Sequence, residues 1–234
     1  MSGYTEGVLI LIGINIIAVL GVSILTGFTR LFSFGNAGFM AVGAYTSAIM
    51  STRYGMPFIV SLLAGIMVPA LLSLALGKLT LRLKGDYFLI ATLGFGECIR
   101  VLIEFLDPIT GGARGYAGIP QKTTFTVVLV SVVMAIILAK NLINSKFGRS
   151  LMAVREQEIA AAAVGIDTSK AKQLAFTVSA MYAGWAGSLF SHYYMFLTPK
   201  MFNLDKSAEF TITVVVGGLG SLTGSIVATT ILTL

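Results

Sequence analysis

Long apolar runs recur along the chain and are separated by shorter stretches that hold its polar and basic residues. An α-helix needs about 20 apolar residues to cross roughly 30 Å of hydrocarbon, and several runs approach that length. A strand of a membrane β-barrel would instead alternate apolar and polar residues over about ten positions. The pattern therefore predicts an all-α, polytopic transmembrane helix bundle with about seven hydrophobic segments, some short or broken, near 7–28, 34–50, 57–76, 87–106, 125–139, 174–197 and 210–234.

Composition agrees with a membrane protein and excludes other classes. Of the 234 residues, 56% are hydrophobic and 11% are charged, whereas a soluble domain carries about 25% charged residues. The net charge of +6 does not indicate nucleic-acid binding, because the basic residues lie between apolar runs and not along one polar face. With Cys98 as the single cysteine and His192 as the single histidine, we expect no internal disulfide and no metal site, and no catalytic motif is recognisable.

We expect one membrane domain over residues 1–234, because no low-complexity linker divides the chain. The first apolar run has neither a basic region before it nor a small-residue cleavage site, so it is not interpreted as a removable signal peptide.

The basic residues predict the orientation in the membrane, because cytoplasmic loops carry an excess of Lys and Arg. The stretches 78–84 and 140–172 hold three and six such residues and are expected to be cytoplasmic, which puts the N-terminus and 107–124 outside. Ten basic residues then lie inside and five outside.

Three charged residues, Glu97, Arg100 and Glu104, interrupt the fourth apolar segment. Spacings of three and four place them on one helix face. An isolated charge at mid-membrane costs about 2.5–3.5 kcal/mol on insertion scales, and pairing of Glu97 with Arg100 would lower that cost. We expect this face to point into the bundle or to a subunit interface. It is then either the lining of a transport path or a structural ion pair between helices.

Glycine-rich stretches weaken the second segment and break the last one at 216–220. Non-helical backbone at membrane depth must be buried in protein or line a cavity, and broken helices recur at transport sites. Close packing of helices at small residues is the alternative explanation for these glycines. The candidates for a translocation path or helix interface are Asn36, Glu97, Arg100, Gly217, Gly218, Gly220 and Ser221.

The polar stretch 140–172 is long for a loop between membrane helices. Strong helix formers predict one short helix over 150–164, with Gly165 as the C′ residue that ends it. The alanines at 160–163 would let this helix sit closely in a groove of another protein, with Arg155, Glu156 and Glu158 around the contact. The alternative is an amphipathic loop helix that lies on the membrane.

Several segments resemble, in order and over nearly the whole chain, the branched-chain amino-acid permeases of bacterial ABC importers, LivM type. The stretch 145–167 resembles the cytoplasmic coupling region of these permeases, although the motif reads Glu158-Ile-Ala-Ala in place of Glu-Ala-Ala. The chain stops inside an apolar run at Leu234, where such permeases usually continue, which predicts a truncated C-terminus. The matching segments are Leu31-Phe-Ser-Phe-Gly-Asn-Ala-Gly-Phe-Met-Ala-Val-Gly-Ala-Tyr-Thr, Arg82-Leu-Lys-Gly-Asp-Tyr-Phe-Leu-Ile-Ala-Thr-Leu-Gly-Phe-Gly-Glu-Cys-Ile-Arg, Thr110-Gly-Gly-Ala-Arg-Gly-Tyr-Ala-Gly-Ile-Pro, Gly148-Arg through Gly165-Ile, and Val216-Gly-Gly-Leu-Gly-Ser.

The resemblance implies an importer in the bacterial inner membrane, with a second permease subunit, identical or homologous, two cytoplasmic ATPases and an extracytoplasmic substrate-binding protein. ATP and Mg²⁺ would bind the ATPases and no cofactor would bind this chain, which has no phosphate-binding loop: Gly77-Lys78 is followed by Leu79 and lacks the upstream glycine. The residues implied in ATPase coupling are Arg149, Arg155, Glu156, Glu158, Ala161, Ala162 and Gly165.

Other readings stay open. Permeases for urea or short-chain amides share the architecture but not the cargo. A secondary transporter or channel would need no cytoplasmic docking helix and would work without an ATPase. A membrane-embedded enzyme would need a polar catalytic cluster at one depth, and only Glu97 and Arg100 come near that.

Overall fold

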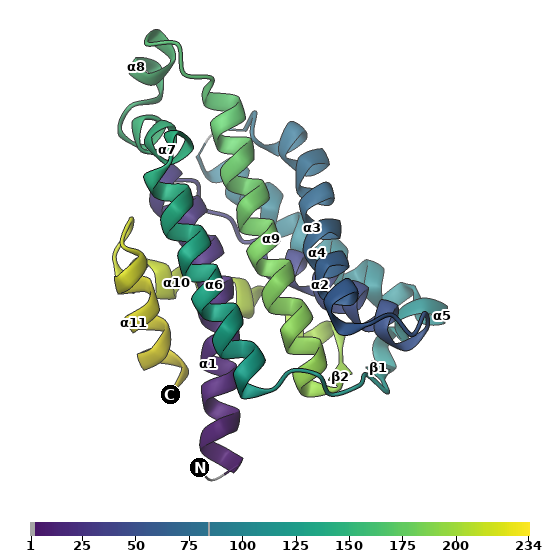
Figure 1. Cartoon of the computed structure of the whole chain (residues 1–234). Helices are drawn as coiled ribbons and strands as arrows, with labels where there is room; N and C mark the ends of the chain where they lie inside the picture. The colour runs from purple at the N-terminus through teal and green to yellow at the C-terminus, as the bar shows by residue number, and fades with distance from the viewer. Residues whose placement is uncertain (1–2, 84) are drawn as a thin grey trace.

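The computed structural model describes residues 3–83 and 85–234, so Lys84, one of the basic residues of the stretch 78–84, lies outside the described part. Almost all elements are helical, which confirms the all-α prediction (Figure 1). The longer helices are α1 (Gly3–Val22), α2 (Asn36–Thr52), α3 (Phe58–Thr80), α4 (Asp86–Phe105), α6 (Phe125–Asn144), α7 (Lys146–Glu156), α9 (Thr168–Tyr194), α10 (Leu204–Gly217) and α11 (Leu222–Thr233). The shorter elements are η1 (Ser23–Gly27), α5 (Asp107–Thr110), η2 (Gly112–Arg114), β1 (Tyr116–Ala117), α8 (Glu158–Ala163), β2 (Phe196–Leu197) and η3 (Pro199–Phe202).

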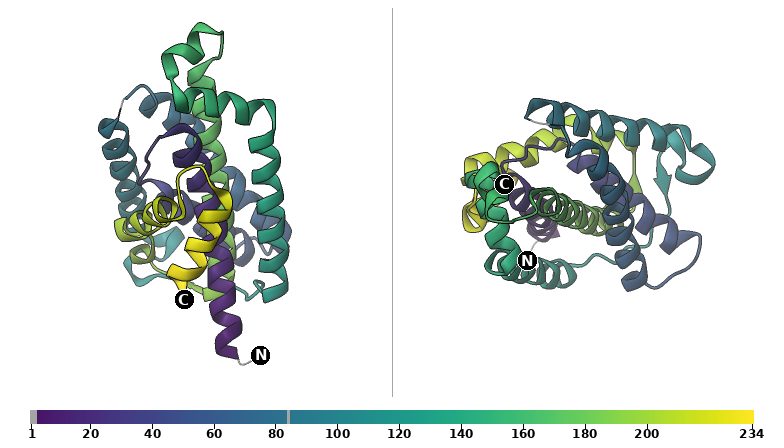
Figure 2. Two further views of the ribbon diagram at one scale, coloured as in Figure 1. Left: turned by 90° about the vertical axis from the view of Figure 1, so that its left-hand side faces the viewer. Right: turned by 90° about the horizontal axis from the view of Figure 1, so that it is seen from above.

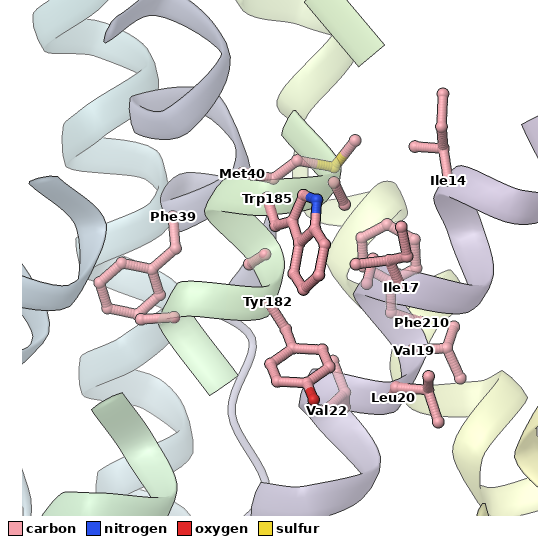
Figure 3. Packing of buried hydrophobic residues seen from close by; sticks show 14 of the residues in the cluster. Ile14, Ile17, Val19, Leu20, Val22, Phe39, Met40, Tyr182, Trp185 and Phe210 are labelled. Atoms are coloured by element: carbon pink, nitrogen blue, oxygen red, sulfur yellow. The ribbon is translucent and has the colours of Figure 1, made fainter. Parts of the chain in front are cut away.

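Helices α1, α2 and α9 form the centre of the bundle. Helix α9 packs against α1, α2 and α3, and α2 also contacts α4. Along α1 apolar residues recur on every side, and Ile14, Ile17 and Leu20 are buried. Figure 3 shows these side chains gathered with Tyr182 and Trp185 of α9. A helix that is apolar all round is expected to be buried, as α1 is here.

Helices α3 and α6 lie at the outside of the bundle and present apolar side chains away from it (Figure 2). Within the described residues, three helices suit a membrane crossing by length and composition: 4–27, which joins α1 to η1, and the helices α3 and α6. The outward apolar residues of α3 and α6 include Ile59, Leu63, Met67, Leu71, Val130, Val133, Met134 and Ile137. Over 59–77 and 125–139 these faces contain no charged residue, as contact with hydrocarbon requires, and the exposed Lys78 and Lys140 follow these stretches.

Glycines bring α2, α3 and α9 close together. A Cβ atom added at Gly43 would overlap Gly184, and one added at Gly184 would overlap the carbonyl of Gly65 and lie 2.7 Å from Cγ of Pro69. The hydroxyl of Ser188 donates to the carbonyl oxygen of Gly184 at 2.9 Å, so its polar atom is satisfied inside this contact. Small residues allow such packing in lipid, where hydrophobicity does not drive helices together.

One end of the bundle is tied by a short antiparallel pair, in which Tyr116 of β1 faces Leu197 of β2. Figure 1 places the N-terminus at this end and α7 and α8 at the other. We call these the β1–β2 end and the α8 end. The loop between α3 and α4 lies at the α8 end, so the described residues of the basic stretches 78–84 and 140–172 share one end of the bundle.

Two sequence predictions were wrong. The last segment is not one broken pass, since α10 begins at Leu204 and crosses the bundle, and α11 then turns back toward the β1–β2 end (Figures 1 and 2). With 14 and 12 residues, these helices are about 21 Å and 18 Å long, shorter than the hydrocarbon layer. The coupling stretch also forms two helices in place of one over 150–164, because Gln157 is extended, with φ −156° and ψ 109°.

We predict that Gly184→Ala lowers the thermal unfolding midpoint of the purified protein, because the added methyl group forces α9 away from Gly65 and Pro69. Overpacking of this kind costs about 1–3 kcal/mol. Gly94→Ala is the control, since a Cβ at Gly94 on α4 has no atom within 4 Å. Circular dichroism in detergent measures both midpoints, and equal midpoints would contradict the packing argument.

Candidate functional site

The projecting segment at the α8 end is built from α7, α8 and the start of α9. The Oγ atom of Ser145 accepts from the amide of Gly148 and caps α7. Leu151 and Val154 are buried and hold α7 against the bundle. At the extended residue Gln157 the chain changes direction, and α8 extends beyond the other helices (Figure 1).

Helix α8 carries exposed apolar residues on an otherwise small-residue surface. Ile159 and Val164 are 81% and 77% exposed, Ala162 is exposed, and only Ala161 turns inward. The helix ends in a Schellman motif: the amide of Ile166 donates to Ala161 O, and that of Gly165 to Ala162 O, each at 3.0 Å. Gly165 has φ +85°, so the predicted C′ glycine is confirmed.

Charged side chains hold the segment around α8. Glu158 in its first turn forms an ion pair of 2.5 Å with Lys172 of α9. The carboxylate of Asp167 caps α9 by accepting from the amide of Lys170, and this backbone hydrogen bond, with that residue's ammonium group, lowers the pKa of Asp167. Arg149 donates to the carbonyl oxygen of Asn144 at 3.3 Å, and Glu156 is exposed.

A second candidate region is a hollow where the first turns of α2 and α10 meet the middle of α4. The amide of Ala37 donates to the Oγ atom of Ser207 at 3.0 Å, which joins the two helix beginnings. Glu97 of α4 lines the hollow. The other lining residues are Phe34, Ala37, Gly38, Leu93, Gly96, Phe202, Asn203, Leu204 and Ser207.

The charged residues of α4 form one ion-pair strip. Arg100 Nε lies 2.8 Å from Glu97 Oε2, and Arg100 Nη1 lies 3.5 Å from Glu104 Oε2. The side chain of Arg100 is 27% exposed, that of Glu97 is 37% exposed and that of Glu104 is 39% exposed. The pairing expected from the i, i+3 spacing is therefore present, and the strip faces away from the centre of the bundle. The described residues contain no group of three His, Cys, Asp or Glu placed to hold a metal ion.

The remaining candidates lie apart from the hollow. Asn36 is buried and faces inward, where its amide donates to Ser33 O at 3.0 Å and its Oδ1 accepts from Ser179 of α9 at 3.1 Å. The break at Gly217, Gly218, Gly220 and Ser221 is at the far end of α10, beside Gly27 and Arg155. The Oγ atom of Ser221 caps α11 by accepting from the amide of Gly224 at 3.1 Å.

Sequence reasoning missed the contribution of 202–207 to the hollow. The stretch between the sixth and seventh apolar runs was treated as a connection, whereas α10 begins inside it at Leu204. A signal was available: Asn203 is a favoured N-cap residue, and its Oδ1 accepts from the amide of Lys206.

Together these features are typical of a membrane transport protein: an ion-paired strip on α4 that faces away from the centre of the bundle, a hollow beside it, and an apolar helix that projects from one end. The chain matches, over residues 4–234, the family described as "Branched-chain amino acid transport system / permease component". The chain therefore belongs to this family of transport permease components.

Named relatives agree with this family. The high-affinity branched-chain amino acid transport system permease protein LivM of Salmonella typhimurium is 35% identical over 94% of this chain and 60% of its own length. LivM of Escherichia coli K12 has the same identity and coverage. A protein of Methanocaldococcus jannaschii named "Probable branched-chain amino acid transport permease protein LivH" is 26% identical over 95% of this chain and 76% of its own length. The chain thus spans about 60% of the LivM relatives. No solved structure gave a significant match.

We predict that Arg100→Ala destabilises the protein in a lipid bilayer more than Glu97→Gln/Arg100→Ala does. The single variant leaves the Glu97 carboxylate without its partner, and an unpaired intramembrane charge costs about 2.5–3.5 kcal/mol. Thermal unfolding in lipid nanodiscs compares the two variants. If the double variant is as unstable as the single one, the strip does not depend on charge pairing.

Proposed function

We propose that this chain is the transmembrane permease subunit of an ATP-driven importer for branched-chain amino acids. The observation that supports this most directly is the family match over residues 4–234. The 35% identity to LivM proteins over 94% of the chain favours leucine, isoleucine and valine as the cargo. The chain itself catalyses no reaction in this proposal.

In this assignment the α8 end faces the cytoplasm and the β1–β2 end faces the outside of the bacterial inner membrane. The basic residues around α7, α8 and the start of α9 support this orientation, because Lys and Arg concentrate in cytoplasmic loops. The N-terminus is then outside. The chain acts as one membrane domain, and the stretch 140–172 is its cytoplasmic coupling loop.

Two cytoplasmic ATPase subunits bind ATP and Mg²⁺, and α8 docks on one of them. The exposed Ile159 and Val164, the small Ala162 and the glycine turn at Gly165 support this role, because an apolar helix of small cross-section fits a groove on a partner. A substrate-binding protein delivers the cargo at the β1–β2 end. A second permease subunit, identical or homologous, completes the membrane part.

The transport path runs past the hollow between α2, α4 and α10. The support for this is the charged strip of α4, since intramembrane charges that are partly exposed need water or a protein partner. Glu97 lines the hollow, and in this proposal its carboxylate meets the ammonium group of the amino acid as it passes. Closure of the ATPase dimer around ATP moves the projecting segment and changes access to this path.

The first test is uptake of labelled leucine by cells with and without this chain, together with a sample depleted of ATP. We expect uptake that requires both the chain and ATP and that unlabelled valine, but not urea, competes away. Uptake that persists without ATP would point to a secondary carrier. Competition by urea would assign the cargo to the urea and amide permeases of the same architecture.

A second prediction concerns docking through α8. Ile159→Glu should reduce co-purification of the ATPase subunits at least tenfold, because it places a charge in the apolar contact. Tyr4→Glu is the matched control: Tyr4 is also 81% exposed but lies at the opposite end of the bundle. If both variants retain the ATPases equally, α8 is not the docking element.

A further inference from the structure

Arg155, at the end of α7, turns toward the bundle and not toward the solvent. Its side chain is 25% exposed, whereas that of the neighbouring Glu156 is 73% exposed. The Nε atom of Arg155 is buried and has no hydrogen-bond partner among the described residues. Its nearest carboxylate is that of Glu156, with Oε1 4.0 Å from Nε, which is the outer limit of an ion pair. The inward direction of this guanidinium group has to be explained by what lies next to it.

The reason is the turn between α10 and α11. A Cβ atom added at Gly220 would overlap Nη1 of Arg155 and lie 3.3 Å from its Cζ. The guanidinium group therefore lies directly over the bare Cα of Gly220. Gly220 has φ +89°, a conformation that also favours glycine. The positive φ is what favours glycine at this position, and a methyl group added there would displace the guanidinium end of the flexible Arg155 side chain.

The charge of Arg155 suits the place where it lies. Helix α10 ends at Gly217, and the last carbonyl groups of a helix carry partial negative charge. A cation near this end is attracted to them. Arg155 thereby connects the last turn of α7 to the turn that follows α10, where Gly220 lies three residues beyond the end of that helix.

The same turn and the helix after it also contact η1, which continues α1. A Cβ added at Gly27 would lie 2.8 Å from the amide nitrogen of Gly220, and the hydroxyl of Ser225 on α11 lies 3.2 Å from that of Ser23. At its other end α10 reaches the hollow, where Ser207 accepts from the amide of Ala37. A displacement of the turn therefore acts on α1 directly and on the hollow through α10.

We propose that Arg155 is a positioning residue that passes movement of the projecting segment to the α10–α11 turn. This rests on the proposed ATP-driven transport, and it reassigns Arg155 from the ATPase contact to a contact inside the permease. Ile159 and the rest of α8 meet the ATPase, and Arg155 carries the resulting displacement into the bundle. Loss of the Arg155 contact uncouples ATP hydrolysis from import while the ATPases stay bound.

The test compares Gly220→Ala with Gly218→Ala in the assembled transporter. The two glycines lie in one turn and have φ of +89° and +92°, so an added methyl group causes similar backbone strain at both. Only at Gly220 does it meet Arg155, whereas at Gly218 there is no atom within 4 Å. The measured quantity is the number of ATP molecules hydrolysed for each leucine imported, with ATPase co-purification measured on the same samples.

We expect Gly220→Ala to raise this ratio about tenfold more than Gly218→Ala, with ATPase binding retained in both variants. Arg155→Ala should match Gly220→Ala, and Arg155→Lys should fall between Arg155→Ala and the wild type, because Lys retains the charge. The double variant Arg155→Ala/Gly220→Ala should raise the ratio no more than the more affected single variant does, since both changes remove the same contact. Equal ratios for Gly220→Ala and Gly218→Ala would overturn the proposal, as would loss of ATPase binding on Arg155→Ala.

Failure of the proposed function gives a different result, in which the wild-type assembly itself imports no leucine or imports it without ATP. In that case the thermal stabilities of Arg155→Ala, Gly220→Ala and the double variant decide whether the contact exists. Additive losses of stability would overturn the inference. A double variant that is no less stable than the more affected single variant would support the contact.

Discussion

The close approach of α2, α3 and α9 at Gly43, Gly65 and Gly184 is the contact on which the rest of the structure depends. Helix α2 begins partway through the bundle, so the amide groups of its first turn have no partner within the helix. Inside a membrane they need partners from protein. Because the glycines let α3 and α9 enclose α2, its first turn is held beside α10, where Ser207 supplies one such partner.

The ion pairs of the α4 strip have a related physical cause, because the membrane interior offers no water to solvate charged groups. Over 59–77 of α3 and 125–139 of α6 the outward faces contain no charged residue, whereas Glu97, Arg100 and Glu104 of α4 are each more than a quarter exposed. The outward faces of α3 and α6 thus suit contact with lipid, whereas the charged face of α4 does not. A face with paired charges is stable within a membrane where water or another protein covers it. This contrast distinguishes the surroundings of α4 from those of α3 and α6.

Features that depend on local sequence could be predicted. The apolar runs located α1, α3, α6 and α9, and the spacing of Glu97 and Arg100 indicated their pairing, because residues three apart on a helix are neighbours. The turn at Gly165 was predictable because glycine is favoured at the C′ position that ends a helix. Features that depend on tertiary contacts were not predictable: nothing near Gln157 in the sequence shows that the chain bends there, and the N-cap residue Asn203 marks the start of a helix but not that this helix crosses the bundle. The inward direction of Arg155 depends on Gly220, 65 positions away, and a single sequence cannot pair them.

The π-helical turn η1 near the end of α1 has a consequence of its own. Such a turn adds one residue to a helix without adding a turn, and each residue rotates the helix by about 100°. Before it, Gly13 faces α6 and Gly21 faces α9; within it, Ser23 and Gly27 face the α10–α11 hairpin. The extra residue therefore shifts the register of the last part of this helix, so that Ser23 and Gly27 meet the α10–α11 hairpin while Gly13 and Gly21 keep their close contacts with α6 and α9.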